Sequence, residues 1–148
     1  LVGVAQTEMG GVLARVLALL GTHHALVVHG EDGADELSIS GPSRVWEVVG
    51  GQVSERRVTP QEAGLETAPL ASVAGGSPAE NAATLRRVLG GEPGPVRDVV
   101  LLNAAAVLVA GERATTLKEG VALARHAVDS GAALSKLESL VALSQRLK

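Results

Sequence analysis

The 148-residue sequence contains no cysteine, which excludes disulfide bonds and cysteine-ligated metals and fits a reducing cytoplasm. Trp46 is the only aromatic residue, so an aromatic stacking surface for single-stranded nucleic acid is not expected. The net charge is −3 and the basic residues are scattered, which does not indicate a nucleic-acid partner. The longest apolar run, residues 99–110, is interrupted by Asn103 and is too short to span a bilayer, so no membrane partner is expected.

The N-terminal part of the sequence has the pattern of a β–α–β unit. Residues 1–5 and 25–28 are short apolar runs typical of buried parallel strands. Over residues 9–20 apolar side chains recur every three or four positions, which predicts an amphipathic helix with Thr7 as N-cap and Gly21 just past its end. The crossover of such a unit is right-handed, so we expect the two strands to lie parallel.

An antiparallel segment follows. Residues 36–40, 44–49 and 52–58 look like strands, and Gly50-Gly51 predicts a two-residue hairpin between the last two. Trp46 is the expected packing anchor of this segment, and we expect no catalytic residue there.

The second half of the sequence predicts four helices. They are expected at residues 78–89, 95–110, 117–129 and 133–147. Capping boxes that begin at Ser77 and Thr116 mark two of the starts, and Thr59 opens a single helical turn before them. We therefore predict an α/β fold: part of a mixed, mainly parallel sheet with an antiparallel hairpin excursion, followed by about four helices. Asn103 is expected to make a hydrogen bond in the core or at a helix end, with a substrate contact as the alternative.

The loop after the second strand gathers most of the potential chemistry, because it holds the four acids Glu31, Asp32, Asp35 and Glu36. Like charges at this spacing repel one another, and a divalent cation would offset the repulsion. In open α/β sheets ligands bind beyond the carboxyl ends of the strands, where this loop is expected. Two interpretations stay open: a solvated acidic turn, and a site where a hard cation such as Mg²⁺ takes oxygens from Asp35 and Glu36.

His29, at the end of the second strand, also has two interpretations. Its ordinary pKa lies near physiological pH, which suits a general acid or base. It could equally orient the loop through a hydrogen bond. The sequence holds no nucleophile elbow, phosphate-binding P-loop or dinucleotide fingerprint, so we assign no catalytic residue.

Several short segments, spread in order over nearly the whole chain, form a combination that is specific although each alone is weak. They are residues 27–30 with Gly33, and residues 35–38, 59–65, 80–82, 97–105, 117–121 and 129–131. In these segments the sequence resembles the C-terminal half of the anthranilate phosphoribosyltransferase family.

The resemblance implies a pentosyltransferase that moves the phosphoribosyl group of phosphoribosyl pyrophosphate (PRPP) to anthranilate and releases pyrophosphate, in cytoplasmic tryptophan biosynthesis. It implies Asp35 and Glu36 as ligands of Mg²⁺, which leaves Glu31 and Asp32 as solvated neighbours. Residues 1–148 would be the C-terminal part of a catalytic α/β domain of the nucleoside phosphorylase/phosphoribosyltransferase type, in a protein that is a homodimer when full length.

The sequence departs from the family in what it lacks. The family's glycine-rich Gly-Thr-Gly-Gly-Asp loop, its Lys-His-Gly-Asn segment, its anthranilate-binding arginine and its N-terminal helical domain have no counterpart. Because Leu1 stands inside an apolar segment without an initiator Met, we expect a missing N-terminal half and little or no transferase activity from the chain alone. The exposed edge at residues 1–5 predicts self-association or marginal stability. The alternatives are a non-catalytic α/β binding or assembly module and part of a pyrimidine nucleoside phosphorylase.

Overall fold

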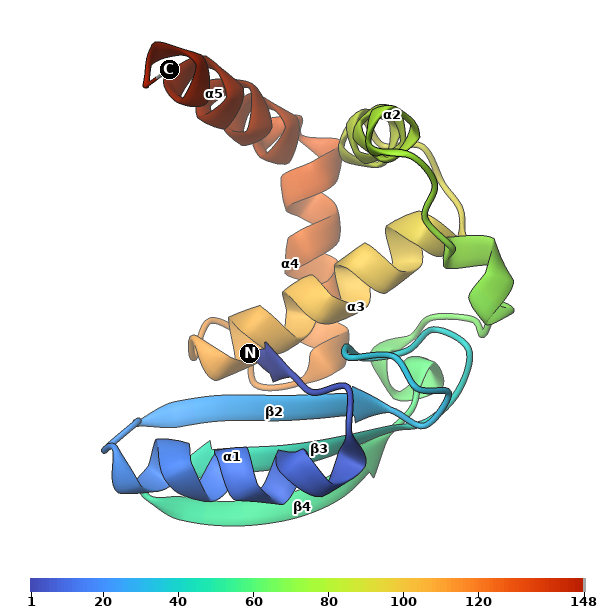
Figure 1. The fold of residues 1–148 in the computed structure, drawn as a ribbon. Coiled ribbons are helices and arrows are strands. Elements are labelled where there is room, and N and C mark those ends of the chain that lie inside the picture. The colour runs from blue at the N-terminus through green and yellow to red at the C-terminus, as the bar shows by residue number, and fades with distance from the viewer. Residues whose placement is uncertain (148) are drawn as a thin grey trace.

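The computed structural model describes residues 1–147, which form a small mixed sheet with helices on both faces (Figure 1). In chain order the elements are β1 (Val2–Gly3), α1 (Thr7–Leu19), β2 (His24–Gly30), β3 (Ser43–Val49), β4 (Gln52–Val58), the 3₁₀ turns η1 (Pro60–Ala63) and η2 (Leu70–Val73), α2 (Pro78–Leu89), α3 (Pro95–Ala110), α4 (Leu117–Asp129) and α5 (Ala132–Arg146). Within residues 1–147 no helix is both long and apolar enough to cross a membrane.

The sheet has the strand order β1-β2-β3-β4. β1 pairs with β2 in parallel, and β2, β3 and β4 pair antiparallel in sequence. The predicted β–α–β unit, the hairpin and the mixed α/β class are thus confirmed. Within the described residues one strand pair is parallel and two are antiparallel, so the parallel share is smaller than predicted, because β3 runs back along the full length of β2.

β2 is buried on both faces, which explains why its sequence does not alternate between polar and apolar residues. Ala25 and Val27 pack against α1 in one cluster. Leu26 and Val28 point the other way, into the larger cluster that contains α3. A strand covered on both sides needs apolar residues at every position.

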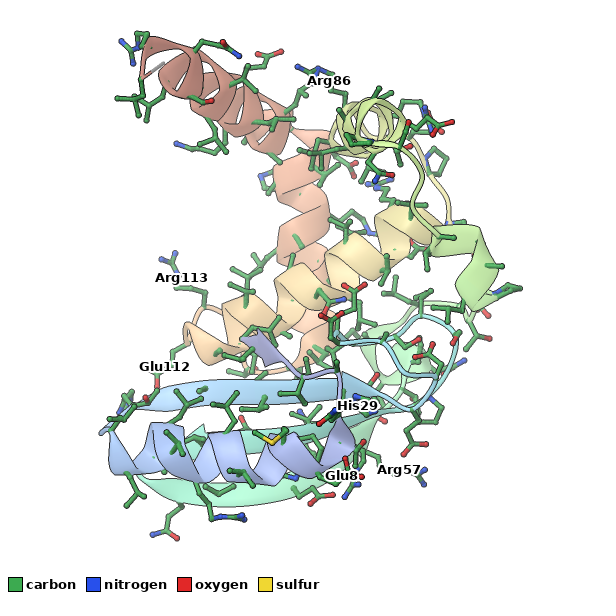
Figure 2. The ribbon with its side chains drawn as sticks, in the orientation of Figure 1. Glu8, His29, Arg57, Arg86, Glu112 and Arg113 are labelled. Atoms are coloured by element: carbon green, nitrogen blue, oxygen red, sulfur yellow. The ribbon has the colours of Figure 1, made fainter. Side chains whose placement is uncertain are left out.

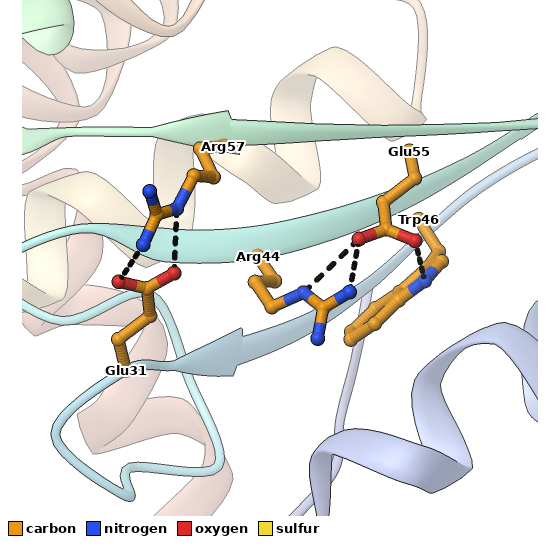
Figure 3. A network of polar contacts seen from close by, with 5 residues as sticks. All are labelled: Glu31, Arg44, Trp46, Glu55 and Arg57. Carbon is orange, nitrogen blue, oxygen red and sulfur yellow. Dashed lines mark hydrogen bonds and ion pairs between the residues drawn. The ribbon is translucent and has the colours of Figure 1, made fainter.

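Trp46 anchors the α1 face, as predicted. It is 4% exposed, and a Cβ at Gly10 of α1 would lie 2.1 Å from its ring. Its indole Nε1 donates a hydrogen bond of 2.8 Å to Glu55 on β4 (Figure 3). Glycine at position 10 therefore lets α1 approach the single aromatic side chain closely.

The local start and turn signals are confirmed, with small shifts. Gly50 and Gly51 both have positive φ, +55° and +83°, as a tight hairpin turn requires. Ser77 and Glu80 form the predicted capping box of α2. Thr116 caps α4, but the Glu119 carboxylate accepts hydrogen bonds from Thr115 instead. α1 begins at Thr7, one residue earlier than predicted, with Gln6 as its N-cap.

The predicted strand at residues 36–40 is wrong, because this segment is irregular. Leu37 and Ile39 are each 1% exposed, so the alternating pattern reflects burial of two side chains in the core. The backbone N–H of Leu37 donates to the Asn103 side chain, and that of Ser38 donates to the Ser43 hydroxyl. The Ile39 carbonyl accepts a hydrogen bond of 3.1 Å from the Ala68 backbone. Side chains and this loop contact bond to the backbone of the segment in place of a neighbouring strand, and a period-two pattern does not distinguish the two cases.

Candidate metal site at the carboxyl end of the sheet

The acidic loop, residues 31–38, leaves the carboxyl end of β2 and crosses the end of β1. Gly3 of β1 makes this crossing possible, since a Cβ at position 3 would lie 1.5 Å from the carbonyl oxygen of Asp35. Any side chain there would collide with backbone, which has little freedom to move. The loop therefore lies at the sheet edge where open α/β folds bind ligands, as the sequence predicted.

Asp32 holds the turn of the loop together. Its carboxylate accepts a hydrogen bond of 3.1 Å from the Ala34 backbone and further hydrogen bonds from the hydroxyls of Ser38 and Ser40. Burial raises the pKa of Asp32, but these three hydrogen bonds together outweigh it, so the pKa lies below the ordinary 3.8. Asp32 is exposed, as expected, but it is a structural residue rather than the merely solvated neighbour that the sequence predicted.

Glu31 also has a partner. Arg57 of β4 donates to both of its carboxylate oxygens, with 2.6 Å between Arg57 Nε and Glu31 Oε1 (Figure 3). The prediction that Glu31 is a solvated neighbour therefore misses an exposed ion pair that ties the loop to the antiparallel hairpin.

Asn103 reaches the loop from α3. Its Oδ1 accepts from the Leu37 N–H at 3.0 Å, and its Nδ2 donates to the Leu37 carbonyl at 2.9 Å and to the Val99 carbonyl at 3.0 Å. This confirms the expected core hydrogen bond, whereas no sequence signal pointed to Leu37, which lies 66 positions away.

The other two acids of the loop are Asp35 and Glu36. Both are exposed, and among residues 1–147 no side chain or backbone group hydrogen-bonds to either carboxylate. Partial burial raises the pKa of Glu36 above its ordinary 4.5, and the nearby negative charges of Asp35 and then Asp32 raise it further. Of the four acids, these two alone are left free, next to like charges that a cation would neutralise.

The donor set fits Mg²⁺ held jointly with a substrate. No group of three or more His, Cys, Asp or Glu within residues 1–147 is arranged to enclose a metal ion. Mg²⁺ usually takes one or two protein carboxylates and completes its shell with waters and substrate phosphates. Two adjacent free carboxylates match that need, whereas they would not form a protein-only cage.

His29 ties the ends of the two parallel strands together. It is 8% exposed, and its Nδ1 donates a hydrogen bond of 2.8 Å to the Val4 carbonyl. This contact supports the orienting interpretation. His23 and His24 lie at the other end of β2 and pair with Glu112 and Glu47 at 2.9 and 2.8 Å, respectively. Figure 2 labels His29 and Glu112 at the two ends. No pattern in the sequence indicated these acid partners.

The sequence profile of the glycosyl transferase family, a/b domain, matches residues 1–134. The chain belongs to this family. Its curated relatives include the anthranilate phosphoribosyltransferase of Thermomicrobium roseum, which is 55% identical over 150 residues that cover 99% of this chain and 43% of that protein. The enzyme of the same name from Symbiobacterium thermophilum is 51% identical over 148 residues, which cover 100% of this chain and 43% of the relative. The chain thus spans less than half the length of these relatives.

Solved structures agree with the family assignment. The anthranilate phosphoribosyltransferase of Thermus thermophilus superposes with a TM-score of 0.86 at 48% identity, over 95% of this chain and 41% of that one. The Saccharomyces cerevisiae enzyme in complex with PRPP and Mg gives a TM-score of 0.82 at 31% identity, over 92% of this chain and 40% of the other. The predicted resemblance and the phosphoribosyltransferase-type fold are confirmed.

Proposed function

We propose that this chain is the part of an anthranilate phosphoribosyltransferase that supplies the Mg²⁺ ligands, Asp35 and Glu36. The whole enzyme transfers the phosphoribosyl group from PRPP to anthranilate and releases pyrophosphate, in tryptophan biosynthesis in the cytoplasm. One observation carries the proposal: Asp35 and Glu36 are the two acids of the loop without a partner among residues 1–147, at the carboxyl ends of β1 and β2. The similarity to the yeast enzyme solved with PRPP and Mg supports it.

In this proposal the residues of the chain divide the work. Asp35 and Glu36 hold Mg²⁺, which when bound screens and orients the departing pyrophosphate. Asp32 holds the turn of the loop through its hydrogen bonds to Ala34, Ser38 and Ser40, which keeps the loop that carries the two ligands at the sheet edge. The mutual repulsion that raises the pKa of Glu36 also favours the binding of a cation.

The remaining parts of the active site lie outside these residues in the proposal. A glycine-rich loop for the phosphates and an arginine for anthranilate come from a further segment of the protein, for which residues 1–148 have no counterpart. The isolated chain is proposed to have little or no transferase activity, and the full-length protein to be a homodimer.

The test is to replace the matching segment of the Thermomicrobium roseum relative with this chain and to follow phosphoribosylanthranilate by its fluorescence. Asp35→Asn combined with Glu36→Gln should lower the Mg²⁺-dependent rate about 100-fold, since a metal ion contributes several kcal/mol and each 1.36 kcal/mol is a factor of ten. Glu31→Gln is the matched control in the same loop, and it should retain the rate because it removes only an exposed ion pair.

An unchanged rate in the double variant would contradict the assignment of the two ligands. This assay, together with a second assay for release of the base from a pyrimidine nucleoside by phosphate, separates the alternatives. A pyrimidine nucleoside phosphorylase needs no acidic pair at this position, so its phosphorolysis would persist without Mg²⁺. A non-catalytic module would give no transfer in the joined protein at all.

A further inference from the structure

The acidic loop is hydrogen-bonded to the helical half of the chain through the side chain of Asn103. Within residues 1–147, Asn103 is the only side chain of α2–α5 that hydrogen-bonds to the loop. It bonds to both backbone groups of Leu37, the residue that directly follows Glu36. Leu37 itself is 1% exposed, so its side chain fixes the same point from inside the core.

The Asn103 carboxamide has no freedom to rotate. Its oxygen accepts from Leu37 N–H, and its nitrogen donates both to the Leu37 carbonyl and to the Val99 carbonyl of its own helix. A flipped amide would set two carbonyl oxygens against its own oxygen and lose all three hydrogen bonds. The side chain therefore fixes the backbone after Glu36 in one orientation relative to α3.

The two ends of the acidic pair are thus held differently. Gly3 lets the Asp35 carbonyl pack directly on β1, where a Cβ would lie 1.5 Å from the carbonyl oxygen. Asn103 of α3 holds the residue after Glu36. Between these two contacts the carboxylates of Asp35 and Glu36 make no hydrogen bond within residues 1–147, so the fold fixes only the direction in which each side chain leaves the backbone.

We propose that Asn103 is a positioning residue for the cation: by holding both backbone groups of Leu37 it fixes the backbone from which the Glu36 and Asp35 side chains project. The inference rests on the proposed function, because it takes these two carboxylates as the metal ligands. Groups that orient metal ligands without touching the metal typically contribute 10- to 100-fold in affinity. The clamp gives α3 a role at a site to which it contributes no ligand.

The chain contains a matched control for this clamp. Asn81 of α2 bonds to Gly76 in the same two-sided way, since its Oδ1 accepts from Gly76 N–H at 2.8 Å and its Nδ2 donates to the Gly76 carbonyl at 3.1 Å. Its capping-box neighbour Glu80 is already bonded to Ser77. Asn81→Leu therefore removes the same kind of contact as Asn103→Leu, but away from the acidic loop.

The experiment uses the joined protein described above, with a fixed concentration of pyrophosphate and Mn²⁺ as the probe, and measures free Mn²⁺ by electron paramagnetic resonance. Asn103→Leu should weaken Mn²⁺ binding about tenfold, and Asn81→Leu should leave it unchanged. Amide hydrogen exchange without metal gives a second readout, in which Asn103→Leu should lose protection at Leu37. Asn103→Asp keeps an acceptor for the Leu37 N–H, so it should retain that protection even where Asn103→Leu folds poorly.

The outcomes separate the two proposals. If Asp35→Asn with Glu36→Gln leaves Mn²⁺ affinity unchanged, or if the unaltered joined protein binds no Mn²⁺ beyond what pyrophosphate alone binds, the metal assignment of the proposed function is overturned. If that double variant abolishes binding while Asn103→Leu folds and binds Mn²⁺ as tightly as the unaltered joined protein, the positioning role is overturned and the metal assignment stands. Equal weakening by Asn81→Leu would also overturn it, because the effect would then be a general loss of stability.

Discussion

The acidic loop and the glycine loop, residues 74–77, are each held by an asparagine side chain, and they differ in whether the nearby carboxylates have hydrogen-bond partners. In each, an asparagine from a helix bonds to both backbone groups of one loop residue, Asn103 to Leu37 and Asn81 to Gly76. At the glycine loop the nearby carboxylate, Glu80, accepts hydrogen bonds from the Ser77 backbone and hydroxyl.

At the acidic loop two of the four carboxylates have no partner among residues 1–147, and they lie beside like charges. A helix start normally uses its acid to satisfy backbone N–H groups, and the capping box at α2 does so. Free carboxylates on a loop that is otherwise firmly bonded have no such structural use. This contrast, more than the number of acids, is the structural support for the proposed ligand site in the acidic loop.

The largest difference in stability between the two regions is expected when the glycine that each loop packs against or contains, Gly3 of β1 or Gly76, is replaced by alanine. Gly3→Ala should destabilise the fold by about 3 kcal/mol or displace the acidic loop, because the new Cβ would lie 1.5 Å from the Asp35 carbonyl oxygen. At Gly76→Ala the nearest atom is a carboxylate oxygen of Glu80 at 2.7 Å, which a side-chain rotation can move, so about 0.5 kcal/mol is expected. Urea unfolding of both variants measures this, and equal losses would contradict the account of the β1 crossing.

Replacing Glu36 of the acidic loop, or Glu80 beside the glycine loop, by glutamine is expected to change the free energy of unfolding by a smaller amount and with opposite sign in the two regions. The pKa of Glu36 is raised, chiefly by burial and then by Asp35 and Asp32, so its stabilising contribution is complete below 4.5 and is lost as the pH rises through its folded pKa. At pH 7 the charged Glu36 is therefore unfavourable, and Glu36→Gln should increase the free energy of unfolding by about 0.5 kcal/mol.

The pKa of Glu80 is instead lowered by hydrogen bonds from the Ser77 hydroxyl and backbone. Its contribution is present above 4.5 and is lost as the pH falls through its folded pKa, so Glu80→Gln should decrease stability at pH 7. Urea unfolding at pH 7 and at pH 3 tests both variants. The gain from Glu36→Gln should vanish at the lower pH, and a loss of stability in both variants at pH 7 would break the contrast between the regions.

The smallest effect is expected at the edge of the acidic loop. Glu31→Gln removes the pairing with Arg57, and both side chains are exposed, so the midpoint of urea unfolding should not change measurably. Adding salt to the unaltered chain should likewise leave the midpoint in place. A clear loss of stability would show that the tie between the loop and β4 carries more of the loop's order than Asp32 and Asn103 do.

The sequence predicted the elements whose signals are local. The capping residues Ser77 and Thr59, the Gly50-Gly51 turn and the apolar period of α1 each depend on neighbours within a few positions, and each is confirmed. The segment at residues 36–40 failed because its alternation has a distant cause, the burial of Leu37 and Ile39.

In the candidate site, too, some features follow from local sequence signals and others depend on residues that are distant in the sequence. Its place after β2 follows from strand order, which the sequence predicted. What distinguishes Asp32 and Glu31 from the other two acids is bonding to Ser40 and Arg57, which become neighbours only when the chain folds. The family resemblance selected Asp35 and Glu36, and the contacts give a physical reason for that selection.

The most direct test of the central claim is an anomalous difference map from crystals of the chain grown with Mn²⁺ and pyrophosphate. We predict a single strong peak at about 2.1 Å from carboxylate oxygens of Asp35 and Glu36, with pyrophosphate oxygens on the side facing solvent. A peak at another position, such as the His23 and Glu112 pair, with the acidic loop free of metal would contradict the account.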